Sequence, residues 1–136
     1  MNIFEKYLKK IINTIQDNKR ELGLKNLNNF NNIVVETPPI KFNSDLSSNI
    51  CLVLAKINNI KPDQLAKKIK KLLLNEINEF KDIEIAGPGF LNINLTNKAI
   101  LLNINEIIDL NEVYGSQKSN YNYNIEFVSA NPTGPM

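Results

Sequence analysis

Apolar side chains recur every three or four positions in several stretches of the chain, a spacing that predicts amphipathic helices. The first stretch covers residues 2–22, and another begins at Pro62, a residue type that suits the first turn of a helix. The side chains expected on the buried faces are Ile3, Phe4, Tyr7, Leu8, Ile11, Ile12 and Ile15 in the first helix, and Leu65, Ile69, Leu72, Leu73 and Ile77 in the helix after Pro62.

Two further helices are predicted with polar residues in position to cap them. Residues 46–58 follow Asp45 and contain Ser47, both candidate N-caps, and residues 97–110 follow Thr96. The apolar positions expected to be buried are Leu46, Ile50, Val53, Leu54 and Ile57 in the former, and Ile100, Leu101, Ile104, Ile107 and Ile108 in the latter.

The region 83–95 alternates between apolar and polar residues instead, the pattern of half-buried strands. Two alternating runs flank Gly87-Pro88-Gly89, which predicts a β-hairpin. A short run, 33–36, is typical of a strand and is stopped by Pro38-Pro39. In the second run of the hairpin, one set of side chains should face the core and the other the opposite side, namely Leu91, Ile93 and Leu95 against Phe90, Asn92 and Asn94.

The order of these elements has too little strand–helix alternation for a parallel doubly wound sheet. We therefore expect an α+β domain over residues 1–112, with a small antiparallel sheet covered by helices. Residues 113–123 are rich in polar residues and lack periodicity, which predicts a linker. Residues 124–136 then begin as a strand and continue as a loop with prolines and a glycine, which indicates the start of a second unit.

Composition and charge narrow the function only slightly. The 136 residues carry 16 basic and 14 acidic side chains, and a net charge of +2 is too small to indicate a nucleic-acid partner by itself. The N-terminus has neither signal-peptide nor membrane-span character, so we expect a cytoplasmic protein with no membrane partner. Cys51 is expected to be a buried free thiol, because the chain has no histidine to activate it, and no cluster of metal ligands is present.

Two groups of side chains could contact RNA. A ring such as Phe90 can stack on an unpaired base, and amides such as Asn92 and Asn94 can bond a base edge, although an ordinary solvated sheet face is the alternative. A flank of four lysines on the third helix could contact phosphates, although a solvated helix face is the commoner explanation; these are Lys67, Lys68, Lys70 and Lys71.

Three segments resemble one enzyme family. Residues 125–136, IEFVSANPTGPM, look like the start of the class I signature of arginyl-tRNA synthetases, in which E-F-x-S-x-N leads through a proline- and glycine-containing turn to two histidines. Residues 85–95, IAGPGFLNINL, resemble the A-G-x-G-F-[IL]-N hairpin of that family's N-terminal additional domain. Residues 45–49, DLSSN, resemble that domain's D-[YFL]-[AS]-[ST]-N helix start, although Ser44 stands where glycine is more usual.

The resemblance implies a division of labour between two parts of the chain. Residues 1–112 would be the additional domain, which in the family contacts the D-loop of tRNA, with Phe90 and Asn92 at positions that meet a base. Residues 124–136 would be the first strand and turn of a Rossmann-type catalytic domain. The family joins arginine to its tRNA with ATP and magnesium. The parent protein is therefore expected to be a monomeric arginine-tRNA ligase with arginine, ATP and tRNA as partners.

The resemblance also assigns roles within the last residues. Glu126, Ser129 and Asn131 would bind arginine. The partial signature consists of Ala130, Asn131, Pro132, Thr133, Gly134, Pro135 and Met136. Because its histidines are absent, we expect the 136-residue chain alone to be catalytically incompetent. A stand-alone tRNA-binding module and a non-catalytic α+β regulatory domain without an RNA partner are the two alternatives.

Overall fold

The computed structural model describes residues 2–27 and 30–116, and in these ranges four α-helices accompany one four-stranded sheet. The elements along the chain are α1 (Ile3–Asp17), β1 (Val35–Glu36), β2 (Leu46–Ser48), α2 (Ile50–Asn58), α3 (Pro62–Glu76), β3 (Phe80–Ala86), β4 (Phe90–Leu95), α4 (Asn97–Leu110) and a 3-10 turn, η1 (Asn111–Val113).

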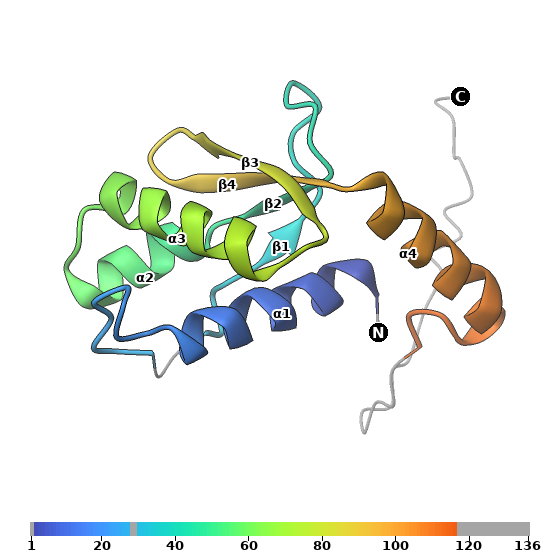
Figure 1. Ribbon diagram of the computed structural model, residues 1–136, viewed down its shortest axis with the longest axis horizontal. Helices are drawn as coiled ribbons and strands as arrows, with labels where there is room; N and C mark the ends of the chain where they lie inside the picture. Colours follow the sequence, from blue (N-terminus) through green and yellow to red (C-terminus); the bar gives the residue numbers. More distant parts are fainter. Residues whose placement is uncertain (1, 28–29, 117–136) are drawn as a thin grey trace, which may run out of the picture.

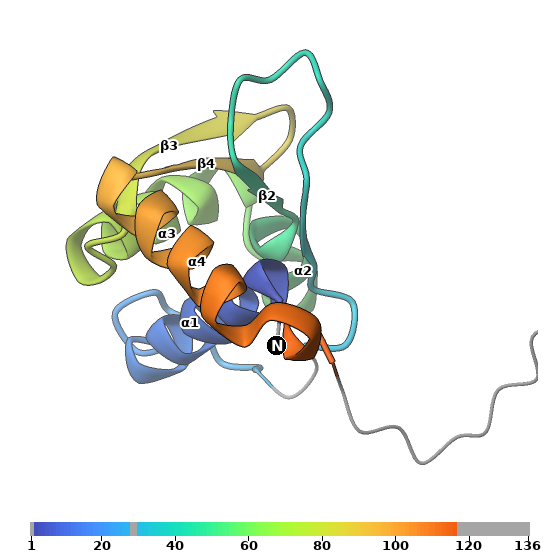
Figure 2. The same cartoon turned by 90° about the vertical axis from the view of Figure 1, so that its right-hand side faces the viewer.

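The sheet has the strand order β1-β2-β4-β3, and every neighbouring pair is antiparallel. Helices α1, α2 and α3 lie on one side of it, as Figures 1 and 2 show from two directions. The loop between β1 and β2 stands out on the other side in both views. This arrangement confirms the predicted α+β fold with a small antiparallel sheet covered by helices.

The core lies between the sheet and these three helices. Tyr7, Ile11 and Ile15 of α1 are fully buried, and the Tyr7 ring packs against Phe80 with 5.6 Å between the ring centroids. The predicted buried face of α3 is confirmed, as are the inward side chains of β4. Burying one such Leu or Ile side chain contributes about 1.5–3 kcal/mol, so this layer stabilises the fold substantially.

Helix α1 ends five residues earlier than the periodicity predicts. After Asp17 the chain turns, and Asn18 donates from its side-chain amide to the carbonyl of Thr14 (2.9 Å). Gly23 has a positive φ of 71°, which a glycine adopts without strain. The turn still buries Leu22, which explains why the apolar rhythm continues beyond the last helical residue.

The predicted start of the helix at 46–58 is wrong, because Leu46–Ser48 form β2 and the helix begins at Ile50. Asp45 is not an N-cap: its carboxylate accepts from the backbone N–H of Leu95 (2.7 Å). The short strand lies between β1 and β4, so its backbone groups find partners on both sides, and this tertiary pairing overrides the local helix signal.

Two strand boundaries also differ from the prediction. The strand expected at 33–36 is limited to Val35–Glu36, whereas the hairpin begins earlier, at Phe80. Asn49 explains the shorter strand, because its side chain accepts from Val34 N–H and donates to the Asn32 carbonyl, both at 2.9 Å. These backbone groups are thus hydrogen-bonded to a side chain and are not available to extend the pairing of β1 with a neighbouring strand.

Helix α4 is confirmed, with Thr96 as its N-cap accepting from Ala99 N–H (3.2 Å), but its predicted burial is wrong. Ala99 and Asn103 are the buried residues of this helix, and Ile100 is half-buried. The other apolar positions that were expected to be buried are exposed, namely Leu101, Ile104, Ile107 and Ile108.

The contact of α4 with α1 explains this difference. Asn103 donates to the Tyr7 hydroxyl (3.0 Å) and accepts from Lys6 Nζ (2.8 Å), so α4 meets α1 through a polar edge. Lys6 also forms an ion pair with Glu106 (2.6 Å). Ile104 and Ile107 line a hollow with Ile3 and Phe4 of α1, but they stay more than 40% exposed, and Leu101 and Ile108 are more exposed still. Within the same described ranges, no helix combines the length and apolar character needed to cross a bilayer.

Candidate nucleic-acid interface

The outer face of the sheet, on the side away from α1, α2 and α3, carries a polar row that the strand register creates. Three cross-strand pairs form this row. Glu36 of β1 is opposite Ser47 of β2, Ser47 is opposite Asn92 of β4, and Asn92 is opposite Glu84 of β3. Direct cross-strand partners point to the same face, so four polar side chains cross the sheet in one line. Phe90, two residues before Asn92 on β4, shares this face.

The hairpin turn before Phe90 is held against the helices. Gly87 and Gly89 both have positive φ, at 54° and 144°. A Cβ on Gly89 would lie 3.3 Å from side-chain atoms of both Leu52 and Pro62, tighter than ordinary contact, so a glycine is needed for the turn to approach α2 and α3 so closely. This anchored turn fixes the position of Phe90 at the start of β4.

The three outward side chains of β4 differ in exposure. Phe90 is 38% exposed and Asn94 is half-buried, as expected for a face outside the core, but only 1% of Asn92 is exposed. The outer face of β4 is therefore closed at its centre. The Nδ2 amide of Asn92 is buried and has no hydrogen-bond partner within the described part of the chain. A buried donor left unpaired destabilises a fold by about 1–3 kcal/mol. An asparagine at this position is therefore unfavourable for folding alone.

Asn92 is among the residues that line a hollow of about 370 Å³, which we call the outer groove. Its floor is formed by Glu36, Ser47 and Asn92 of the polar row. The hairpin contributes residues of the turn together with Phe90, and the loop between β1 and β2 contributes Pro39, Lys41 and Phe42. A hollow of this size is at the lower end of the range for small-ligand sites.

Sequence reasoning identified Phe90 and Asn92 but missed the residues that β1, β2 and their loop bring to the groove. Ser47 was interpreted as a helix cap, and Glu36 as the end of a strand. Lys41 and Phe42 belong to no periodic pattern, because they follow two prolines in a loop. The register of β2 against β4 places Ser47 beside Asn92, and the fold of the loop brings Lys41 and Phe42 to the same hollow.

The four lysines of α3 do not form one surface. Lys67, Lys68 and Lys71 are exposed and Lys70 is half-buried, and the helical turn places Lys68 and Lys70 on opposite flanks. Two of the four, Lys68 and Lys71, line a hollow of about 300 Å³ between α3 and the turn after α1, which we call the lysine hollow.

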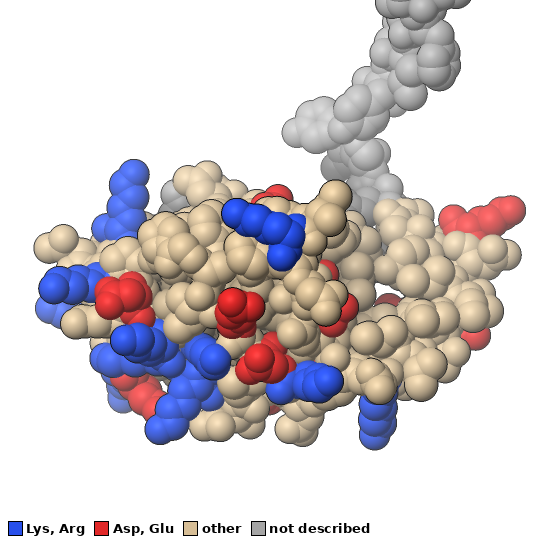
Figure 3. Space-filling view, turned by 90° about the horizontal axis from the view of Figure 1, so that it is seen from above, with Lys and Arg blue, Asp and Glu red and all other residues tan. Residues whose placement is uncertain are grey.

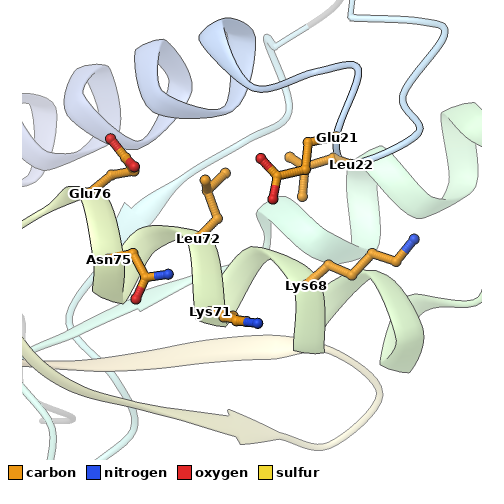
Figure 4. A pocket seen from close by; sticks show the side chains of 7 residues that line it. All are labelled: Glu21, Leu22, Lys68, Lys71, Leu72, Asn75 and Glu76. Atoms are coloured by element: carbon orange, nitrogen blue, oxygen red, sulfur yellow. The ribbon is translucent and has the colours of Figure 1, made fainter.

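The lysine hollow has mixed charge. Glu21 and Glu76 line it together with Lys68 and Lys71, and Figure 4 shows all four side chains around it. Two carboxylates beside two ammonium groups lower the positive potential that a phosphate would meet there. Figure 3 shows that the top of the molecule likewise has interspersed basic and acidic side chains, with no large field of one sign.

Cys51 carries no chemistry in this arrangement. The thiol lies on the buried face of α2, as predicted, and burial raises its pKa from 9.0 to about 12. A thiol with this pKa stays protonated at neutral pH and is a poor nucleophile. In residues 2–27 and 30–116, no group of three or more His, Cys, Asp or Glu side chains could hold a metal ion.

The predicted arginine-binding residues, Glu126, Ser129 and Asn131, lie outside the described residues, as does the partial signature at 130–136. The predicted linker at 113–123 is described only as far as Ser116. These assignments therefore stay predictions.

Comparison with known proteins identifies the family. The family model described as "Arginyl tRNA synthetase N terminal domain" matches residues 2–95. Proteins named "Arginine--tRNA ligase" from Rickettsia akari (strain Hartford) and Pelagibacter ubique (strain HTCC1062) are 40% and 39% identical to this chain over 141 and 140 residues. A protein of the same name from Rickettsia bellii (strain OSU 85-389) is 40% identical over 145 residues.

Each of these three comparisons covers 100% of this chain but only 23%, 24% and 23% of the relative, respectively. The chain thus spans about a quarter of the length of the curated relatives it matches. Since the family model covers more than half of the chain and the fold agrees with the expected α+β domain, the chain belongs to the arginyl-tRNA synthetase family, and its residues 2–95 match the N-terminal domain of that family.

Proposed function

We propose that the parent protein is an arginine-tRNA ligase and that the domain described here binds tRNA through the outer groove. The names of the relatives and the match to the family's N-terminal domain support the first part. The second part is supported by one observation, the buried and unpaired Nδ2 amide of Asn92 beside the exposed ring of Phe90.

An unpaired base suits this pair of side chains. Its flat face can stack on the ring of Phe90, which contributes about 1–3 kcal/mol per base. Its edge carries carbonyl and ring-nitrogen acceptors, which can take the hydrogen bond that Asn92 Nδ2 lacks in the free protein. The free-energy penalty of the unpaired amide would then be relieved only when the base is bound.

The D-loop of tRNA is the proposed source of this base. Bases in loops are unstacked more readily than bases in a helix, and single-stranded positions are the ones that proteins read by stacking and edge contacts. Asn94 lies farther along β4 on the same face and is half-buried, so we place it at the margin of the contact.

The remaining family assignments belong to the same proposal. Arginine would be bound by Glu126, Ser129 and Asn131, and ATP with magnesium near the partial signature in the Rossmann-type part of the parent enzyme. No residue of these proposed sites lies in the described ranges. Lysines 67, 68, 70 and 71 remain a secondary proposal for phosphate contact, weakened by the mixed charge of the lysine hollow.

Equilibrium binding of the chain to an arginine tRNA transcript tests this function. The Phe90→Ala substitution removes an exposed ring on the outer face, so the fold should persist while affinity falls by about five-fold or more. Ile108→Ala on α4 removes an exposed apolar side chain far from the groove residues in sequence and is the matched control. Equal affinity of the Phe90→Ala variant and the unaltered chain would contradict the proposal.

A further inference from the structure

The two walls of the outer groove come from opposite ends of the sheet. The hairpin turn precedes Phe90, at the N-terminal end of β4. Leu46, the first residue of β2, pairs with Ile93, and Asp45 binds the backbone of Leu95, so the loop between β1 and β2 begins and ends at the C-terminal end of β4. Yet residues of both segments line the same hollow. The loop must therefore fold back over the sheet and face the hairpin across Ser47 and Asn92.

A tight turn gives this loop a defined shape. The backbone N–H of Phe42 donates to the carbonyl of Pro39 (2.9 Å), which closes a four-residue turn. Ile40 at its tip is fully exposed and does not line the groove, whereas Phe42 is half-buried and does. Lys41 also lines the groove, and its Nζ lies 5.0 Å from the centre of the Phe42 ring.

We propose that this turn is the second wall of the tRNA site, with Phe42 packing on the face of the base that Phe90 does not cover and Lys41 contacting a phosphate of the same loop. The proposal rests on the function proposed above. It adds two residues that no pattern in the sequence singled out, and it makes the site a slot with a ring on each side and the Asn92 amide at its floor.

The positions of the charged side chains support a phosphate contact at Lys41 and a base contact at the floor of the groove. Among the described residues that line the groove, Lys41 is the one cation and Glu36 the one anion. Glu36 lies in the polar row beside Ser47, where a carboxylate would repel a phosphate but can accept from an amino group of a base. Lys41 is exposed and follows Ile40, the fully exposed residue at the tip of the loop. The base is therefore expected at the floor, and the backbone of the RNA at the loop.

Substitution of Phe42 tests the second wall. Phe42→Leu keeps an apolar side chain in a half-buried position, so the turn should stay folded, while the stacking ring is lost. We expect the 136-residue chain with this change to bind an arginine tRNA transcript about five-fold more weakly or worse. Ile40→Ala, in the same turn but outside the groove, is the matched control and should bind as the unaltered chain does.

Salt dependence tests Lys41 separately. Each phosphate contact contributes to the slope of log affinity against log salt, so Lys41→Met should reduce this slope by about 1. Lys98→Met, at an exposed position on α4, carries the same charge change and should leave the slope as it is. An unchanged slope for Lys41→Met would overturn the assigned role of Lys41.

The failure of this inference is distinguishable from failure of the proposed function. If Phe90→Ala weakens binding but Phe42→Leu binds like the Ile40→Ala control, the groove binds tRNA without a second aromatic wall and the inference is wrong. If neither variant weakens binding, both are wrong. Coupling between the two changes is the positive signature, because two rings that stack on one base should give a double variant whose loss differs from the sum of the single losses.

Discussion

The outer groove and the lysine hollow are both candidate RNA surfaces of similar size, but their polar side chains differ in burial and in the partners they have. In the lysine hollow, Lys68 and Lys71 are exposed and share the space with Glu21 and Glu76. In the outer groove, Asn92 is buried with a donor that no described residue pairs, and aromatic rings come from two directions. The charged groups of the lysine hollow can pair with water and with each other, whereas the Asn92 amide has no hydrogen-bond partner among the described residues.

This difference shows why a count of lysines is a poor guide to an RNA site in a chain of low net charge. Exposed charges of both signs are screened by salt and contribute little per pair. A buried polar group without a partner contributes more to the free energy of binding, because its missing hydrogen bond is formed only in the complex. The comparison therefore ranks the groove above the lysines, and the following changes test that ranking.

The largest effect is expected when both groove side chains on β4 are changed. Phe90→Ala removes the stacking ring, and Asn92→Leu removes the donor while keeping a side chain of similar shape, so the double variant should bind tRNA about 100-fold more weakly. Fluorescence anisotropy at fixed salt measures this loss. A loss no larger than that caused by removing Lys68 and Lys71 would reverse the ranking.

The Asn92→Leu change, which should weaken tRNA binding, should at the same time make the folded chain more stable. Replacing an unpaired buried amide by an apolar group of similar shape removes the desolvation penalty, so the free energy of unfolding should rise by about 1 kcal/mol. Urea denaturation of the chain measures it. Asn103→Leu is the contrasting variant: its amide donates to Tyr7 and Ala99, so this change should destabilise the fold. If both variants lose stability alike, the Asn92 amide has a hydrogen-bond partner in the folded chain, and the proposed penalty is wrong.

A smaller effect is expected in the lysine hollow. Changing Lys68 and Lys71 together to methionine should weaken tRNA binding only about three-fold at low salt, since exposed charge contacts contribute about 0.2–1 kcal/mol each at most. The difference should vanish as salt is raised. A loss that equals the groove variant and persists at high salt would identify the hollow as the main site.

The smallest effect is expected from the acidic side of the same hollow. Glu76→Gln leaves the fold of α3 intact and removes one of the two carboxylates beside Lys68 and Lys71. If the lysines contact phosphates at all, affinity should rise by less than about two-fold at low salt. A fall in affinity would show that no phosphate lies near this face.

Local patterns predicted the elements that depend on local chemistry. The hairpin followed from alternation around Gly87-Pro88-Gly89, and α3 from Pro62 and a regular apolar face. β2 was missed because three residues with two serines carry no strand signal, and only pairing on both sides makes them a strand.

The burial of α4 and the second wall of the groove could not be read from periodicity. An apolar face such as that of Leu101 and Ile108 indicates which side of a helix can be covered, but not whether the described chain covers it. Phe42 reaches the groove through the turn at Pro39 and the pairing of β2 with β4, a tertiary arrangement that no local pattern encodes. The sequence thus predicted Phe90 and Asn92 as candidates, while tertiary structure determined which side chains surround them.

The most direct test is a binding cycle between Asn92 and the bases of the tRNA D-loop. A series of arginine tRNA transcripts, each with one abasic D-loop position, is titrated against the unaltered chain and against Asn92→Leu. We predict one position whose removal weakens binding to the unaltered chain about ten-fold but hardly affects the variant, because the base and the amide are partners. Equal losses in the two proteins at every position would contradict the claim that the outer groove binds a tRNA base.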